Sequence, residues 1–199
     1  MPVVTGRREA TKAANRAAIL AAALEVFAEL GYEAAGVRDV IRRTELAPGT
    51  FYNYFPDKES VFAALVQRTV DDARARVAVA RSRARGGPAL VEDGFRAYFH
   101  FIVENPARHA FLSRNWATIR HAYEAESSFP GPVADLQADL CTAIARGDLP
   151  DADVEYTAHA MVAVGLELAG RLLQRDPPDV EGATRFASGL FLGGLGQTP

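Results

Sequence analysis

Apolar residues recur at three- and four-residue spacing along almost the whole chain, and no segment shows the strict apolar–polar alternation of a strand. Between 13 and 30 these apolar positions are Ile19, Leu20, Ala23, Leu24, Phe27 and Leu30. Proline and glycine residues separate further helical segments, expected at 37–44, 48–54, 58–85, 89–104, 106–122, 132–146, 152–175 and 179–195. The sequence therefore predicts an all-α fold.

The clearest break in this pattern is Gly86–Gly87–Pro88, where we place the domain boundary. It separates a helix-turn-helix domain at 1–57, followed by a long linking helix at 58–86, from a C-terminal domain at 87–199. Residues 1–86 carry 14 Lys and Arg against 10 Asp and Glu, whereas residues 87–199 carry 8 against 15. The net charge of −3 is therefore the sum of +4 in the N-terminal part and −7 in the C-terminal part. A basic N-terminal part favours a polyanionic partner such as DNA.

The sequence lacks the motifs of several other protein classes. Its single cysteine, Cys141, cannot form an intrachain disulfide, and the four histidines lack the spacing of a metal-binding pair. No nucleophile, phosphate-loop or dinucleotide motif is found, so we expect no enzyme, no catalytic residues, no metal and no cofactor. The first residues lack a signal-peptide core, and no apolar run reaches the length of about 18 residues that a membrane helix needs. We therefore expect a cytoplasmic protein without membrane contact.

Residues 37–55 show a helix-turn-helix pattern, in which a three-residue turn joins two short helices. Helices this short need a core beneath them, and the spacing assigns that core to Leu46, Phe51, Phe55, Val61, Phe62 and Leu65. Because Phe51 and Phe55 take the inner face, we expect Tyr52 and Tyr54 to point outward. Hydroxyl and amide side chains on the outer face suit the major groove of DNA.

This segment resembles the tetracycline-repressor (TetR) family. The resemblance rests on Val37-Arg-Asp-Val-Ile, on Leu46-Ala-Pro-Gly-Thr-Phe-Tyr-Asn-Tyr-Phe-Pro-Asp-Lys58-Glu and on the upstream run Ala22-Ala-Leu-Glu-Val-Phe-Ala-Glu-Leu-Gly-Tyr. It implies an N-terminal three-helix DNA-binding domain and a C-terminal helical bundle that binds an effector and dimerises, usually in a repressor. Carried over by position, Thr50, Tyr52, Tyr54 and Lys58 match DNA-contacting residues of the family. Together with residues of the same outer face and of the preceding helix, the predicted DNA-binding residues are Arg38, Pro48, Gly49, Thr50, Tyr52, Asn53, Tyr54 and Lys58. Among these, Lys58 matches a phosphate contact.

The chain departs from the usual TetR pattern at three places. Thr44 and Glu45 stand where Ala-Gly is common, Ala47 where a serine often caps the next helix, and Gly36 where a threonine cap is common. Because glycine suits a left-handed turn, we expect either about 1 kcal/mol of strain at Glu45 or a different turn.

Aromatic residues are dense in the helices expected at 89–104 and 106–122, with a few polar residues among them. An ordinary helical core would show the same pattern, but the TetR resemblance implies an effector pocket among these helices. Its predicted lining is Phe95, Tyr98, Phe99, Phe111, Asn115, Trp116 and Leu140. Such a lining predicts a small hydrophobic or amphipathic effector. The runs Asn105-Pro, Leu112-Ser-Arg-Asn-Trp-Ala-Thr-Ile-Arg120 and Gly147-Asp-Leu-Pro150 are similar to family members that sense fatty acyl-CoA.

Small residues line the last two expected helices. They are Ala158, Ala160, Ala163, Gly165, Ala169, Gly170, Ala187, Ser188, Gly189, Gly193 and Gly194. Small residues weaken a helix unless close packing uses them, so we expect these helices to pair with their symmetry mates. The result is a homodimer, whose two-fold symmetry predicts a palindromic operator.

The basic residues Arg7, Arg8 and Lys12 precede the first expected helix. Two interpretations stay open for them: a solvated tail, or an arm that contacts phosphates.

Two function classes stay open at this stage. The first is a ligand-responsive transcriptional regulator, by family habit a repressor, that an effector releases from double-stranded DNA. The second is a helical small-molecule-binding protein or enzyme that keeps the helix-turn-helix as scaffold only. The polar face of Thr50, Tyr52 and Asn53 favours the first class, because a scaffold would not need it.

Overall fold

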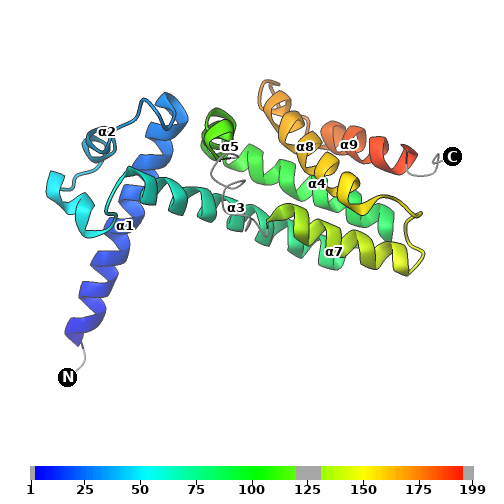
Figure 1. The fold of residues 1–199 in the computed structure, drawn as a ribbon, viewed down its shortest axis with the longest axis horizontal. Helices are drawn as coiled ribbons and strands as arrows, with labels where there is room; N and C mark the ends of the chain where they lie inside the picture. Colours follow the sequence, from blue (N-terminus) through cyan, green and yellow to red (C-terminus); the bar gives the residue numbers. More distant parts are fainter. Residues whose placement is uncertain (1–2, 120–130, 195–199) are drawn as a thin grey trace. The chain divides into compact units, whose positions relative to one another are not determined.

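The computed structural model describes residues 3–119 and 131–194, with side chains from Arg8 onward. These residues form helices and no strand, which confirms the predicted all-α class (Figure 1). The elements are α1 (Val3–Leu30), α2 (Val37–Arg42), the 3₁₀ helix η1 (Pro48–Asn53), α3 (Lys58–Arg83), α4 (Gly87–Glu104), α5 (Pro106–Arg114), α7 (Pro132–Ala145), α8 (Val154–Leu172) and α9 (Val180–Gly194). Every helix among them is too short or too polar to span a bilayer.

Two compact units divide the described chain. The N-terminal unit contains residues 3–69 and 110–119, and the bundle unit contains residues 70–109 and 131–194. Both α3 and α5 supply residues to both units. This division follows packing, whereas the boundary predicted from the sequence follows the break at Gly86–Pro88.

Helix α1 begins ten residues earlier than the apolar pattern indicates. From Arg7 to Arg16 most residues are strong helix formers (Ala, Arg, Lys and Glu), so the helix continues without a buried face. Its second half buries Ile19, Leu20, Ala23, Val26 and Phe27. Gly31 ends α1 with a φ of 81°, and its amide donates to the carbonyl of Phe27 (3.1 Å).

Side-chain carboxylates cap three helices. Asp57 accepts from the Ser60 amide at 2.7 Å, as expected for the start of α3. Asp153 accepts from the Tyr156 amide of α8 at 2.9 Å, and Asp179 accepts from the amide of Gly182 of α9 at 2.8 Å. The helix predicted at 106–122 is interrupted at Asn115, and its expected end, with Arg120 and His121, lies outside the described residues.

Four aromatic rings form the centre of the N-terminal unit. Phe27 meets Phe62 with ring centroids 5.3 Å apart, and Phe62 meets Phe111 at 5.4 Å. Tyr32 lies 4.5 Å from Phe62. The helix-turn-helix therefore rests on residues from α1, α3 and α5.

The bundle unit has one apolar core, in which α4 packs against α8 and α9 and α7 packs against α8. Small residues let α8 approach α4 inside the chain. Ala158 and Ala169 are fully buried, and a Cβ on Gly165 would lie 3.6 Å from the rings of Phe95 and Tyr98. This corrects one expectation: Gly165 packs within the protomer, because Ala158, Gly165 and Ala169 share a face of α8 that is buried in its own core.

Candidate nucleic-acid interface and bundle core

Two phenylalanines hold η1 against the N-terminal unit. Phe51 and Phe55 are buried, with ring centroids 6.0 Å apart. Tyr52 lies between them in sequence and is 61% exposed. The predicted orientation of these three residues is confirmed, because neighbouring side chains of a helix point in different directions. Leu46, expected in the same core, is half-buried.

Thr44 closes the turn and Asp39 caps α2, in place of the residues that are common in the TetR pattern. The Thr44 hydroxyl donates to the Ile41 carbonyl (2.9 Å) and accepts from the Leu46 amide (3.2 Å). The Gly36 amide donates to the Asp39 carboxylate (2.9 Å). The departures from the TetR pattern thus leave the turn hydrogen-bonded, with local side-chain bonds in place of the expected ones.

The outer face of α2 and η1 presents most of the predicted DNA-binding residues. Five are exposed, namely Arg38, Pro48, Gly49, Tyr52 and Asn53, and two are half-buried, namely Thr50 and Tyr54. This face carries a guanidinium, hydroxyls and an amide over a short stretch of backbone. Such groups bind phosphate oxygens and the edges of bases.

Residues of α1, which the sequence analysis did not assign to this face, lie at its end. Asn15 donates its amide hydrogen to the Tyr54 hydroxyl at 3.0 Å. The guanidinium carbon of Arg16 lies 5.1 Å from the ring centroid of Phe55. Because the Tyr54 oxygen accepts here, its O–H can still donate to a phosphate. In the sequence, the four-residue spacing of Arg8, Lys12 and Arg16 could have indicated a basic helix face next to this interface.

Lys58 points toward the loop after α1. Its ammonium donates to the carbonyls of Tyr32 (2.7 Å) and Ala35 (3.1 Å), and it lies 4.2 Å from the Tyr32 ring centroid. An ammonium has three donors, so two of them are used to hold the loop. A phosphate contact of Lys58 stays a prediction, and it has the third donor available.

The arginines near the turn differ in how strongly acidic side chains neutralise them. Arg43 forms ion pairs with Glu29 and Glu25 of α1. The hydrogen bond from Arg43 holds the pKa of Glu29 below its usual value, and the same bond raises the pKa of Arg43. Arg38 is exposed, and Arg42 lies only loosely beside Asp39 at 3.8 Å. Positive charge for a polyanion therefore comes from Arg38 and Arg42.

The bundle core brings together four of the seven predicted effector residues. Phe95 and Phe99 of α4 stack with ring centroids 5.9 Å apart, and Leu140 of α7 is buried in the same core. Tyr98 packs against this core. Its buried hydroxyl has no hydrogen-bond partner among the described residues, and burial raises its pKa.

The other three predicted effector residues lie in the N-terminal unit, so the structure does not bring all seven into one core, and their effector contact stays a prediction. Phe111 belongs to the aromatic centre of that unit. Asn115 is buried, donates to the carbonyls of Phe27 (3.0 Å) and Phe111 (2.7 Å), and accepts from the amide of Tyr32 (2.6 Å). Trp116 is 46% exposed. Asn115 thus satisfies backbone groups that are left free where α1 ends, which explains why a polar residue is buried here.

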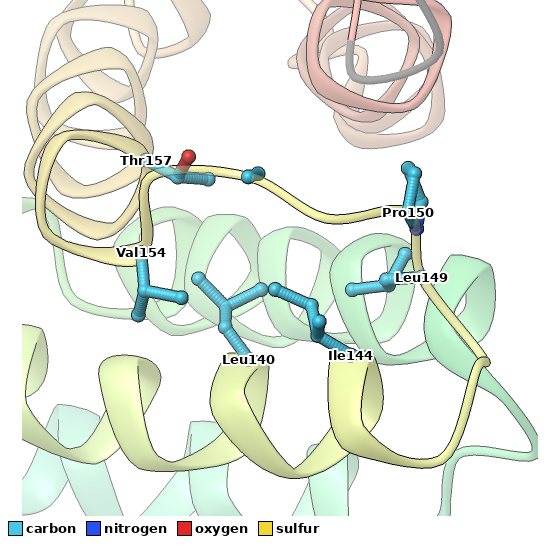
Figure 2. A pocket seen from close by; sticks show the side chains of 7 residues that line it. Leu140, Ile144, Leu149, Pro150, Val154 and Thr157 are labelled. Carbon is cyan, nitrogen blue, oxygen red and sulfur yellow. The ribbon is translucent and has the colours of Figure 1, made fainter.

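A small apolar cavity lies where α7 meets the segment leading into α8 (Figure 2). Its lining consists of Leu140, Ile144, Leu149, Pro150, Ala152, Val154 and Thr157. The cavity volume is about 10 Å³, the size of one water molecule. Leu140 joins this cavity to the bundle core.

The helix-turn-helix region is similar to a known protein family. Residues 19–65 match the family described as bacterial regulatory proteins, tetR family. The matched range runs from the second half of α1 through η1 into α3, which is the stretch that builds the candidate interface. The chain is a TetR-family transcriptional regulator.

Similarity to other transcriptional regulators extends over most of the chain. It is 29% identical to the HTH-type transcriptional activator FasR of Mycolicibacterium smegmatis over 197 residues, covering 93% of this chain and 84% of FasR. The transcriptional regulator FadR of Bacillus subtilis, solved in complex with stearoyl-CoA, has a TM-score of 0.74 at 19% identity over 89% of this chain and 98% of that one. The fatty acid degradation regulator FadR of Bacillus halodurans has a TM-score of 0.74 at 20% identity, covering 90% of this chain and 95% of that one. These solved structures share the fold.

Proposed function

We propose that this TetR-family regulator binds a near-palindromic operator as a homodimer, and that an amphipathic effector with an acyl chain changes its operator affinity. The observation that carries the proposal is the exposed polar face of η1, which Phe51 and Phe55 hold from behind. Thr50 and Asn53 are proposed to contact base edges, and Tyr54 and Arg38 to contact phosphates. We also propose a cytoplasmic location, since that is where operator DNA lies.

Exposed apolar residues on α9 support the homodimer. Phe186 is 58% exposed and Leu190 is 49% exposed, four residues apart on one face. On the same part of α9, a Cβ added to Gly189 or Gly193 would meet no described atom within 4 Å, so a partner backbone can approach closely. Exposed large apolar groups on a helix favour an interface with a second copy. Leu190→Asp should give a monomer in sedimentation, whereas Val79→Asp should not.

The bundle core supports an apolar effector. The core residues Phe95 and Phe99 adjoin Leu140, which also lines the cavity of Figure 2. A cavity of about 10 Å³ is far too small for an acyl chain. We therefore propose that the chain enters by separating α7 from α8 near Leu140. That the FadR structure of similar fold holds stearoyl-CoA makes a long-chain acyl-CoA the first compound to test.

Selection of bound duplexes from randomised DNA tests the DNA-binding part. We expect an enriched inverted repeat, and Thr50→Ala and Asn53→Ala should each cost about 1–3 kcal/mol and change the preferred base. Recovery of no enriched repeat by the wild-type protein would contradict the proposal.

The effector part has its own test. Stearoyl-CoA should change operator affinity about 5- to 150-fold, the range of typical allosteric coupling, whereas CoA alone should not. Ala152→Leu, at a half-buried residue of the cavity lining, should block the opening between α7 and α8 and abolish the response while operator binding persists. Repression stays a prediction, and because FasR is named an activator, a promoter–reporter assay must determine the sign of regulation.

A further inference from the structure

The first half of α1 extends beyond the packed part of the N-terminal unit (Figure 1). Residues 8–14 are all exposed, and burial begins at Ile19. The match to the tetR family also begins at residue 19, so it leaves this half of the helix without an assigned role. An exposed helical stretch of this length is marginal in water by itself, so a binding partner would stabilise it.

The charges on this stretch are one-sided. Arg8, Lys12 and Arg16 are spaced by four residues, which places them on one face of α1. None of the three takes part in an ion pair among the described residues. Between residues 3 and 24 the only acidic residue is Glu9. The face is therefore an uncompensated positive strip that favours a polyanion.

The length of this strip matches a nucleic acid strand. Arg8 and Arg16 are separated by about 12 Å along the helix axis. Over that axial distance one strand of duplex DNA carries about three or four phosphates.

The strip is also continuous with the candidate interface. Arg16 lies over the Phe55 ring (5.1 Å), directly after η1, and the neighbouring Asn15 bonds to Tyr54 (3.0 Å). These contacts fix the position of α1 relative to η1. A duplex bound at η1 therefore has its backbone within reach of α1.

We infer that Arg8, Lys12 and Arg16 form a second DNA-binding surface, which contacts the phosphate backbone beside the bases that η1 reads. This inference rests on the proposed function, whose DNA-binding face it extends. Since phosphates carry no sequence information, the surface adds affinity and fixes register without changing base preference.

The test is the salt dependence of DNA affinity for the double variant Arg8→Gln/Lys12→Gln. Glutamine is a good helix former, and both positions are exposed, so the fold is retained. The slope of log K against log salt should fall by about 1.8 per protomer, since each lost phosphate contact removes about 0.9. Affinity at low salt should fall about tenfold or more, equally for the selected operator and for random duplex.

The matched control is Arg83→Gln/Arg85→Gln, which makes the same change in net charge at exposed residues outside the N-terminal unit. This control should keep the wild-type slope. A wild-type slope in Arg8→Gln/Lys12→Gln, or an equal loss in the control, would overturn the inference. Failure of the proposed function looks different: the wild type itself then selects no sequence, whatever its salt slope.

Discussion

The two compact units differ in where their directed long-range bonds lie. In the N-terminal unit, the buried Asn115 and the half-buried Lys58 join segments that are distant in sequence, so directed hydrogen bonds reach into the unit beside its aromatic centre. In the bundle unit, such bonds are partly exposed ion pairs such as Arg74–Asp135, whereas the core consists of packed apolar side chains and the buried Tyr98 hydroxyl finds no partner among the described residues. Directed bonds allow one geometry, whereas apolar packing tolerates repacking at modest cost. We infer that the recognition face is held in one shape while the bundle can rearrange around an effector.

The largest expected effect is in the bundle core. Phe99→Ala removes a fully buried ring that stacks on Phe95, and should lower the free energy of unfolding by about 3–5 kcal/mol. Denaturant unfolding followed by circular dichroism measures the change. The exposed Val79→Ala should change stability by less than about 0.5 kcal/mol. If Phe99→Ala costs as little as Val79→Ala, the core is not the source of bundle stability.

Asn115→Leu tests the directed bonds of the N-terminal unit. Leucine has a similar size but leaves the Tyr32 amide and the Phe27 carbonyl without this partner, so unfolding should become easier by about 2–3 kcal/mol. Hydrogen exchange at the Tyr32 amide should accelerate. Trp116→Phe, at the exposed neighbouring residue, serves as control. Unchanged exchange at Tyr32 would show that the amide bond is not needed there.

Lys58→Met separates loop anchoring from phosphate binding. Methionine keeps much of the stem but loses the bonds to the Tyr32 and Ala35 carbonyls, so stability without DNA should fall by about 1–2 kcal/mol. Thermal unfolding of the free protein measures this loss. A variant with wild-type stability but a reduced salt slope for DNA binding would assign Lys58 to phosphate alone.

Tyr98→Phe should have the opposite sign to Asn115→Leu. Its hydroxyl is buried without a described partner, so removing it should stabilise the protein by about 1 kcal/mol. The two variants together contrast a satisfied polar group with an unsatisfied one. A loss of stability in Tyr98→Phe would mean that the hydroxyl is hydrogen-bonded in solution. Weaker binding of stearoyl-CoA would in addition place it at the effector.

The smallest effect concerns pH. Hydrogen bonds from Arg74 and Arg43 hold the pKa values of Asp135 and Glu29 below their usual 3.8 and 4.5. Each pair therefore contributes stability above those values and loses it as the pH falls through the lower, folded-state pKa. Asp135→Asn should cost at most about 1 kcal/mol at pH 7, because the pair is partly exposed, and this cost should shrink as the pH falls below the usual carboxyl pKa. Unfolding curves of wild type and variant over this pH range check this, and a pH-independent difference would contradict it.

Local patterns in the sequence were enough to predict most of the helices and the side of η1 that faces outward. The spacing of Phe51 and Phe55 requires Tyr52 to face outward, and the cap at Asp57 follows from residues three apart. The start of α1 was missed because its first half has no apolar face, so only the helix propensity of its Ala, Arg, Lys and Glu residues indicated a helix.

Long-range partners were decided by the tertiary structure alone. A buried asparagine near aromatic residues fits an effector pocket as well as a bond to the end of α1, and the sequence cannot tell which backbone groups come within 3 Å. The same holds for Lys58, whose carbonyl partners lie more than twenty residues away, and for Gly165, whose neighbours are rings of α4. Periodicity and capping depend on residues within one or two turns, so the sequence determines them. A hydrogen-bond partner or a packing neighbour across the fold depends on how the helices are arranged, and that arrangement minimises the free energy of all contacts together.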